Sequence, residues 1–162
     1  MKLLLRAKID CDLDTFKNNL MKSSSLNYIC YPLLVFKPID RDALPTIWTE
    51  DNFKVKMYFL RLIPLGHQYI SIDFPIPKNS GEFIIRDNGS GKIALTWDHF
   101  IFINKSNQED QIIYTDQVKI EARILTLPVF IFAFFFYKWR QYRWKKLVRL
   151  SFEPLKVYYT FK

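Results

Sequence analysis

The sequence predicts an α+β fold in which a curved antiparallel sheet covers one long C-terminal helix. Two observations lead to this fold class. Most of the chain up to residue 123 consists of short apolar or alternating runs separated by turn-forming residues, which is typical of strands joined by hairpins. After them, the uncharged and mostly apolar residues 124–137 lead directly into the basic segment 138–146. A membrane span needs about 20 apolar residues, so this run predicts the first half of a core or interfacial helix.

The start of the chain predicts one strand and two short helices. Apolar and charged residues alternate through residues 3–9, which gives a strand with one core-facing side. Asp12 or Asp14 can then cap a helix that runs to Leu20, because an aspartate oxygen accepts an otherwise unpaired amide of the first turn. A second short helix can begin within residues 23–25.

Six further strands are predicted between this helical segment and the long helix. Turn chemistry separates several of them, at residues 64–66, 75–81, 87–91 and 105–107, and such short connections suit antiparallel neighbours. The expected strands are residues 33–39, 53–62, 68–74, 83–86, 94–104 and 112–123.

The last strand indicates which face of the sheet is covered. Its alternation places one set of residues on a single face: Tyr114, Asp116, Val118, Ile120 and Ala122. The C-terminal helix is the element available to cover them. Thr126 is the expected N-cap, Pro128 falls in the first turn where proline is tolerated, and the helix is expected to end near Leu150. A helix of that length, on the order of 35 Å, can cross a seven-stranded sheet.

Length and composition predict a single domain over residues 1–151. The 162-residue chain is 17% aromatic and contains only 4 glycines, so it has ample core material and few flexible linkers. Residues 152–162 are expected to be a C-terminal extension, either a further short strand or a loose tail.

The two cysteines and the N-terminus predict a cytoplasmic protein. Cys11 and Cys30 have no metal-ligand or redox spacing and are expected to be reduced core thiols. Charged residues interrupt the first apolar stretch before a signal peptide would be complete. The formal net charge of +8 favours acidic lipids, nucleic acid or anionic ligands, without selecting one of them.

The order of one strand, two short helices, six strands and one long helix resembles the SRPBCC superfamily of helix-grip proteins. This superfamily includes START lipid-transfer domains, polyketide cyclases and plant pathogenesis-related allergens. The resemblance covers residues 2–150, and four segments resemble small bacterial members: residues 53–59, 63–66, 97–99 and 114–116. It implies a hydrophobic cavity between sheet and helix that binds or transports a lipid or other apolar small molecule. Some branches use this cavity for cyclase or hydrolase chemistry.

The strand and helix patterns then predict which side chains line such a cavity. Strand residues of one parity and one stripe of the helix should face each other. Arg61 shares this parity at a strand end, where its guanidinium group could meet an anionic head group. The candidate ligand-binding residues are Val55, Met57, Phe59, Arg61, Ile70, Ile72, Trp97, His99, Asp116, Val118, Ile120, Phe130, Phe134 and Tyr137.

His99 and Asp116 are expected to meet across neighbouring strands. Such a pair could orient a ligand or act as an acid-base pair in a cyclase- or hydrolase-type enzyme, but a hydrogen-bonded structural pair is the commoner outcome. No motif supplies a nucleophile, and the histidines have no metal-ligand spacing. The sequence therefore favours a non-enzymatic carrier, with no metal, no cofactor and no assigned catalytic residue, and His67 is expected in an exposed turn.

The long helix leaves two questions open. Phenylalanines occur on every side of its first half, so either Phe130 and Phe134 face the cavity while other elements cover the rest, or Val129, Phe132 and Phe136 contact a membrane or a second subunit. The basic residues of its second half can form a solvated face or contact anionic lipid peripherally: Lys138, Arg140, Arg143, Lys145, Lys146 and Arg149. Nucleic acid is disfavoured because no reader motif is present.

Overall fold

The computed structural model describes residues 1–157 and has the predicted α+β architecture. The N-terminal half contains β1 (Lys2–Ile9), α1 (Leu13–Leu20), α2 (Ser23–Cys30), β2 (Leu34–Pro38), β3 (Asp51–Phe59) and β4 (Ile63–Asp73). The C-terminal half contains β5 (Glu82–Gly91), β6 (Thr96–Lys105), β7 (Ile112–Glu121), a 3-10 turn η1 (Arg123–Leu125), α3 (Thr126–Arg149) and α4 (Pro154–Val157).

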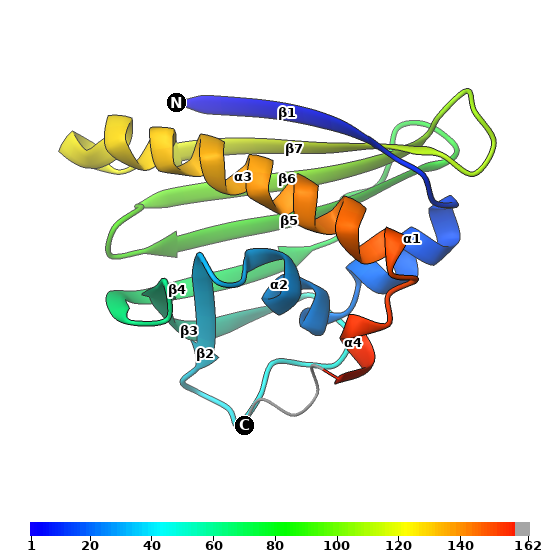
Figure 1. Ribbon diagram of the computed structural model, residues 1–162. Coiled ribbons are helices and arrows are strands. Elements are labelled where there is room, and N and C mark those ends of the chain that lie inside the picture. The colour runs from blue at the N-terminus through cyan, green and yellow to red at the C-terminus, as the bar shows by residue number, and fades with distance from the viewer. Residues whose placement is uncertain (158–162) are drawn as a thin grey trace.

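The seven strands form one antiparallel sheet in the order β1-β7-β6-β5-β4-β3-β2. From β2 to β7, strands that follow one another along the chain are paired, while β1 pairs with β7 and so lies at the edge opposite β2. Figure 1 shows α3 lying across one face of this curved sheet, with α2 beside it over the strands β2 to β4. No helix within residues 1–157 is long and apolar enough to cross a membrane.

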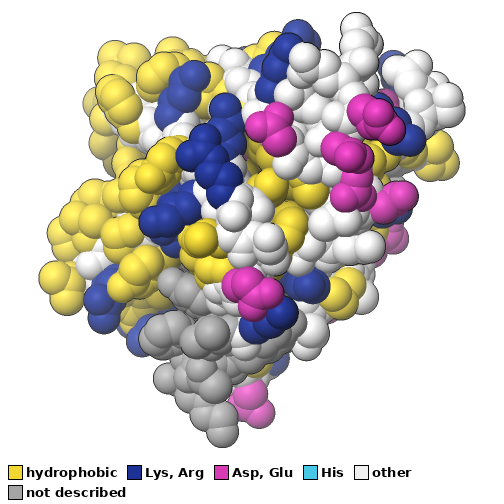
Figure 2. All heavy atoms as spheres, turned by 45° about the vertical axis from the view of Figure 1, so that its right-hand side comes forward, with side chains coloured by type: hydrophobic (Ala, Val, Ile, Leu, Met, Phe, Trp, Pro, Cys, Tyr) yellow, Lys and Arg dark blue, Asp and Glu magenta, His cyan; other side chains and the backbone are white. Residues whose placement is uncertain are grey.

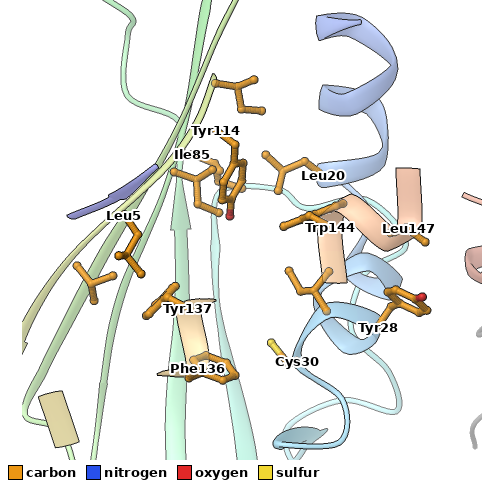
Figure 3. Close-up of a cluster of buried hydrophobic side chains, with 14 of the residues drawn as sticks. Leu5, Leu20, Tyr28, Cys30, Ile85, Tyr114, Phe136, Tyr137, Trp144 and Leu147 are labelled. Carbon is orange, nitrogen blue, oxygen red and sulfur yellow. The ribbon is translucent and has the colours of Figure 1, made fainter. Parts of the chain in front are cut away.

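The core lies between the sheet and the helices. Tyr114 on β7, Phe16 on α1 and Trp144 on α3 are all fully buried, and the Phe16 ring centroid lies 4.8 Å from that of Trp144 and 5.8 Å from that of Tyr114. Figure 3 shows Leu20 and Trp144 beside the Tyr114 ring. Because each buried aromatic side chain stabilises the fold by roughly 1.5–3 kcal/mol, this cluster holds the C-terminal half of α3 on the sheet.

One predicted helix cap is confirmed and one is wrong. The Asp12 carboxylate accepts a hydrogen bond of 2.8 Å from the Thr15 amide at the start of α1, as expected of an N-cap. Thr126 does not cap α3. Its hydroxyl accepts from the Ala122 amide at 2.9 Å and donates to the Arg123 carbonyl at 2.7 Å, so it closes the turn η1 that leads from β7 into the helix.

Two segments predicted to be turns are strands. Residues 64–66 belong to β4, where Gly66 (φ +93°) lies opposite an irregularity in β3, and the exposed His67 is a strand residue. Residues 87–91 belong to β5. A side chain at Gly89 would lie 2.7 Å from the Tyr69 carbonyl oxygen, so this glycine permits the close approach of β4 to β5 and does not mark a hairpin turn.

The C-terminal extension begins as a helix. Residues 154–157 form α4, not the short strand considered from the sequence, and Leu155 is buried in the core. Of the four aromatic residues of the predicted extension, Phe152 packs against the core, and Tyr158, Tyr159 and Phe161 lie outside the described residues.

Candidate functional site: a cavity between the sheet and the long helix

A cavity of about 370 Å³ lies between the sheet, α2 and α3, and most of its wall is apolar. This volume is within the range of small-molecule pockets. Seven of the residues predicted from the sequence line it: Met57, Phe59, Ile70, Ile72, Trp97, His99 and Tyr137. Among the cavity-lining residues, Leu125 and Pro128 are themselves exposed, so the cavity opens at the N-terminal end of α3.

Seven other predicted residues do not line the cavity. Val55, Asp116, Val118 and Ile120 are fully buried in the core behind its wall. Phe130 packs against the core and Phe134 is exposed, so neither lines the cavity, and α3 presents Val129, Phe132 and Phe136 to it instead. This stripe is the one that the second of the two sequence alternatives assigned to a membrane or a second subunit. Arg61 stays outside, where its guanidinium donates a 3.2 Å hydrogen bond to the Tyr31 hydroxyl.

His99 and Asp116 form the predicted pair. His99 Nε2 lies 2.9 Å from Asp116 Oδ1, which also accepts from the Tyr114 hydroxyl at 2.9 Å, while Gln141 Nε2 donates to Asp116 Oδ2 at 3.1 Å. Both carboxylate oxygens of this fully buried residue therefore have donors. Burial is the main cause that lowers the pKa of His99, so its ring is neutral near pH 7. In this neutral ring Nε2 carries the hydrogen and donates it in the hydrogen bond to Asp116.

Arg140 is the cation of the cavity wall. Its side chain is only 4% exposed, and its guanidinium group lies 4.9 Å from the Tyr137 ring centroid. Within residues 1–157 it makes no ion pair, and its buried Nε donates no hydrogen bond. A guanidinium group remains charged at any physiological pH, so this wall contains a permanent positive charge that the protein does not pair directly.

Asp87 and Gln68 are the other polar residues of the wall. Burial raises the pKa of the Asp87 carboxyl group to about 7, although a 2.9 Å hydrogen bond from the Ser71 amide favours the ionised form. Asp87 is therefore protonated in part of the molecules at neutral pH. Asp87 and His99 on the sheet and Arg140 on α3 form a polar patch in the otherwise largely apolar cavity wall.

Sequence reasoning missed Arg140 and Asp87 for different reasons. Arg140 was assigned to the basic surface face, but it follows Ala133, Phe136 and Tyr137 at helical spacing on the buried stripe. That spacing indicates Arg140 only once the inward stripe of α3 is known. Asp87 was placed in a turn because Asn and Gly follow it, and no local signal indicated that this segment is a strand.

Another member of the predicted basic face also turns inward. The Arg143 guanidinium lies 3.9 Å from the Tyr28 ring centroid and donates to the Tyr28 carbonyl at 2.9 and 3.2 Å, which ties α3 to α2. The basic surface of α3 is thus smaller than predicted, with Lys138, Lys145, Lys146 and Arg149 remaining exposed.

The cysteines offer no chemistry to this cavity. Both are buried and form no disulfide, as expected, and burial raises the pKa of the Cys30 thiol in the wall to about 12. A thiol that stays protonated is a poor nucleophile. Across the described part of the chain, no three His, Cys, Asp or Glu residues lie close enough to hold a metal ion.

Comparison with solved structures identifies the fold. No protein-family model and no curated protein sequence matches the chain. A START superfamily protein from Mycobacterium smegmatis matches 90% of this chain and 98% of its own, at 8% identity and a TM-score of 0.53. Norcoclaurine synthase from Thalictrum flavum matches over 91% of this chain and 86% of the synthase chain, at 8% identity and a TM-score of 0.56. The protein has an SRPBCC-type fold.

The SRPBCC-type fold recurs in a hypothetical protein from Helicobacter pylori, which is 11% identical, matches 90% of this chain and 86% of its own, and has a TM-score of 0.60. Identities this low establish the common fold and no common activity. The resemblance stated from the sequence is confirmed at this level.

The raised pKa of Asp87 predicts a pH-dependent effect of Asp87→Asn on stability. Between the unfolded pKa near 4 and the folded pKa near 7, the folded state binds more protons, so the contribution of Asp87 to stability falls as pH rises through this window. The variant should gain stability relative to the parent between pH 4 and pH 8, on the order of 3 kcal/mol at most.

Urea denaturation of both proteins at several pH values measures this difference, in which contributions shared by the two proteins, such as that of His99, cancel. Asp42→Asn, on an exposed loop, removes the same charge and serves as the control. A difference between Asp87→Asn and the parent that does not change with pH would show that the Asp87 carboxyl is not desolvated.

Proposed function

We propose that the protein binds a hydrophobic small molecule or lipid in the cavity between the sheet and α3, as a carrier or sensor. The observation that carries this proposal is the cavity itself, which is about 370 Å³ in volume, has an apolar wall and opens at the N-terminal end of α3. An apolar molecule enters such a site because its surface and that of the wall are both removed from water.

A tryptophan at the cavity entrance should block binding. Val129→Trp adds a large ring to a residue that lines the cavity near its open end, whereas Ile131→Trp adds the same ring to an exposed position on the same helix. We expect Val129→Trp to weaken binding of the neutral apolar dye Nile red about tenfold or more, since lost contacts worth about 1.4 kcal/mol change affinity tenfold.

Fluorescence titration of purified protein gives both affinities, and native mass spectrometry of the parent shows whether a ligand from the expression host is retained. Equal Nile red affinities for Val129→Trp, Ile131→Trp and the parent would place the binding site outside the cavity. That result would refute the proposal.

His99 supports a second candidate function, an enzyme of the cyclase or hydrolase type. Its ring lines the cavity, is neutral because burial lowers its pKa, and is oriented by Asp116 at 2.9 Å. Because the Nε2–H group of His99 donates to Asp116, the other ring nitrogen, Nδ1, can accept a proton from a water molecule or substrate. In this alternative Asp116 positions His99 and does not reach the substrate, because it is buried behind the wall.

His99→Gln tests the enzymatic alternative. Any hydrolysis of a medium-chain p-nitrophenyl ester by the cavity should fall to the background rate in this variant, because general-base catalysis typically contributes about 10²-fold or more. Nile red affinity should change little and reports an intact cavity. Hydrolysis that persists in His99→Gln would eliminate His99 as the base.

The surface around the cavity opening supports peripheral contact with an anionic membrane. Several large apolar side chains are exposed there, among them Leu62 (83% exposed) in the β3–β4 turn and Ile124 (94% exposed) before α3. Figure 2 shows hydrophobic side chains gathered along one edge of the molecule, with most visible acidic side chains toward the other. Exposed apolar patches of this kind usually mark interaction sites.

Acidic residues are absent from the chain connections at the opening. The four connections at the opening, residues 31–33, 60–62, 92–95 and 122–125, contain Arg61, Lys92 and Arg123 and no acidic residue. The opposite end of the sheet has the exposed acidic residues Asp10, Asp12, Asp40, Asp42, Glu50, Glu109, Asp110 and Glu153. Because each basic residue near an anionic surface contributes about 1 kcal/mol, this orientation would present the cavity opening to the bilayer. The basic C-terminal half of α3, for which the sequence left a solvated face and a lipid contact as alternatives, lies away from the opening.

Serine substitutions at the rim should weaken membrane binding. We expect the double variant Leu62→Ser with Ile124→Ser to reduce partitioning onto phosphatidylserine vesicles about tenfold or more, because two exposed apolar side chains are lost from the contact. Vesicle co-sedimentation measures this. The matched control is Ile39→Ser with Ile76→Ser, at the acidic end of the molecule, which should bind as the parent does. Equal loss in both double variants would contradict contact through the rim.

A further inference from the structure

Arg140 is a charged group in a largely apolar wall, and no carboxylate of residues 1–157 lies within ion-pair distance of it. Placing an isolated ion in a low-dielectric environment costs several kcal/mol unless a counter-ion or hydrogen bonds offset it. The Arg140 side chain is 4% exposed, contacts the Tyr137 and Phe136 rings at 4.9 and 5.9 Å, and makes no ion pair within residues 1–157.

Two carboxyl groups, Asp116 and Asp87, act on Arg140 through space, but neither forms an ion pair with it, and the oxygens of both accept hydrogen bonds from other groups. Asp116 already accepts hydrogen bonds from His99, Tyr114 and Gln141 through its two oxygens. Asp87 accepts from the Ser71 amide, and burial raises its pKa to about 7, so its charge is only partial at neutral pH. The guanidinium donors that reach the cavity are thus available to a ligand.

The position of Arg140 defines how a ligand would lie. Arg140 is twelve residues beyond Pro128, the exposed lining residue at the cavity opening, which is roughly 18 Å along the helix axis at 1.5 Å per residue. The wall between them is apolar and includes Val129, Phe132 and Phe136. A ligand that reaches Arg140 therefore has a polar end deep in the cavity and an apolar body toward the opening.

The charges around Arg140 favour a head group with a single negative charge. A guanidinium group matches the two oxygens of a carboxylate in a planar, two-donor arrangement. A phosphate monoester has a charge of about −1.5 to −2 at neutral pH, and its excess negative charge would be repelled by the buried Asp116 and by ionised Asp87. One carboxylate neutralises one guanidinium group.

We propose that the cavity binds a single-chain amphiphile whose carboxylate head pairs with Arg140 and whose apolar tail points toward the N-terminal end of α3. This inference rests on the proposed ligand-binding function and specifies its chemical class. It also explains why an unpaired arginine lies on the buried stripe of α3, where an apolar residue would otherwise be expected.

The test compares two ligands that differ in the head group alone, dodecanoate and dodecanol. Isothermal titration calorimetry at pH 8, on protein stripped of retained ligand, gives both affinities for the parent. A hydrogen-bonded charge contributes about 1.5–3 kcal/mol, so the parent should bind dodecanoate at least about tenfold more tightly than dodecanol.

Arg140→Met should remove this preference. It should weaken dodecanoate binding about tenfold or more and leave dodecanol binding within about twofold. Methionine fills a similar volume without the charge, and replacing a buried unpaired ion by an apolar side chain is typically neutral or stabilising, so the variant should fold. Lys138→Met removes the same charge from an exposed position of α3 and should leave both affinities as in the parent.

Arg140→Lys keeps the charge without the two-donor geometry and should retain only part of the preference. It also tests the inference if Arg140→Met fails to fold. A parent protein that binds dodecanol as tightly as dodecanoate would overturn the carboxylate inference and leave the proposed function standing. A parent that binds neither ligand and does not bind Nile red would overturn both.

Discussion

The packing of α3 on the concave side of the sheet is the contact on which the rest of the structure depends. Its C-terminal half is held by buried aromatic contacts, with Trp144 4.8 Å from the Phe16 ring centroid. The hydrogen bond from Gln141 to the buried Asp116 fixes the position of α3 against β7 more specifically than hydrophobic packing alone. The N-terminal half of the helix is less tightly covered, and the cavity lies where the wall of the sheet and the helix separate.

This division of α3 also separates the roles of its polar residues. Gln141 and Arg143 make hydrogen bonds within the protein and fix the helix against β7 and α2. Arg140, one residue before Gln141, lies in the cavity wall and makes no ion pair among the described residues. Buried polar groups are normally satisfied by the protein itself, so Arg140 Nε and Trp144 Nε1, which have no hydrogen-bond partner and belong to residues of the cavity wall, mark this wall as a candidate binding surface.

The polar patch serves both candidate functions in different ways. In a carrier, His99 and Asp87 adjust the polarity around a bound head group, and both are largely or partly neutral at pH 7 because of burial. In an enzyme, the same neutral His99, oriented by Asp116, would be the base. A neutral His99 and a partly protonated Asp87 beside the permanent guanidinium charge of Arg140 are compatible with binding an anion.

The sequence by itself determined the order of elements, the sheet-facing parity of β7 and the meeting of His99 with Asp116, because these depend on periodicities of two and 3.6 residues that local pattern reveals. Only the tertiary structure decided the rotation of α3, since a helix apolar on every side has no sequence signal for which stripe faces inward. It also placed Arg140 inside and Arg61 outside, and it made residues 87–91 a strand. Those outcomes follow from packing against distant segments, such as the close approach of Gly89 to Tyr69, which no local propensity encodes.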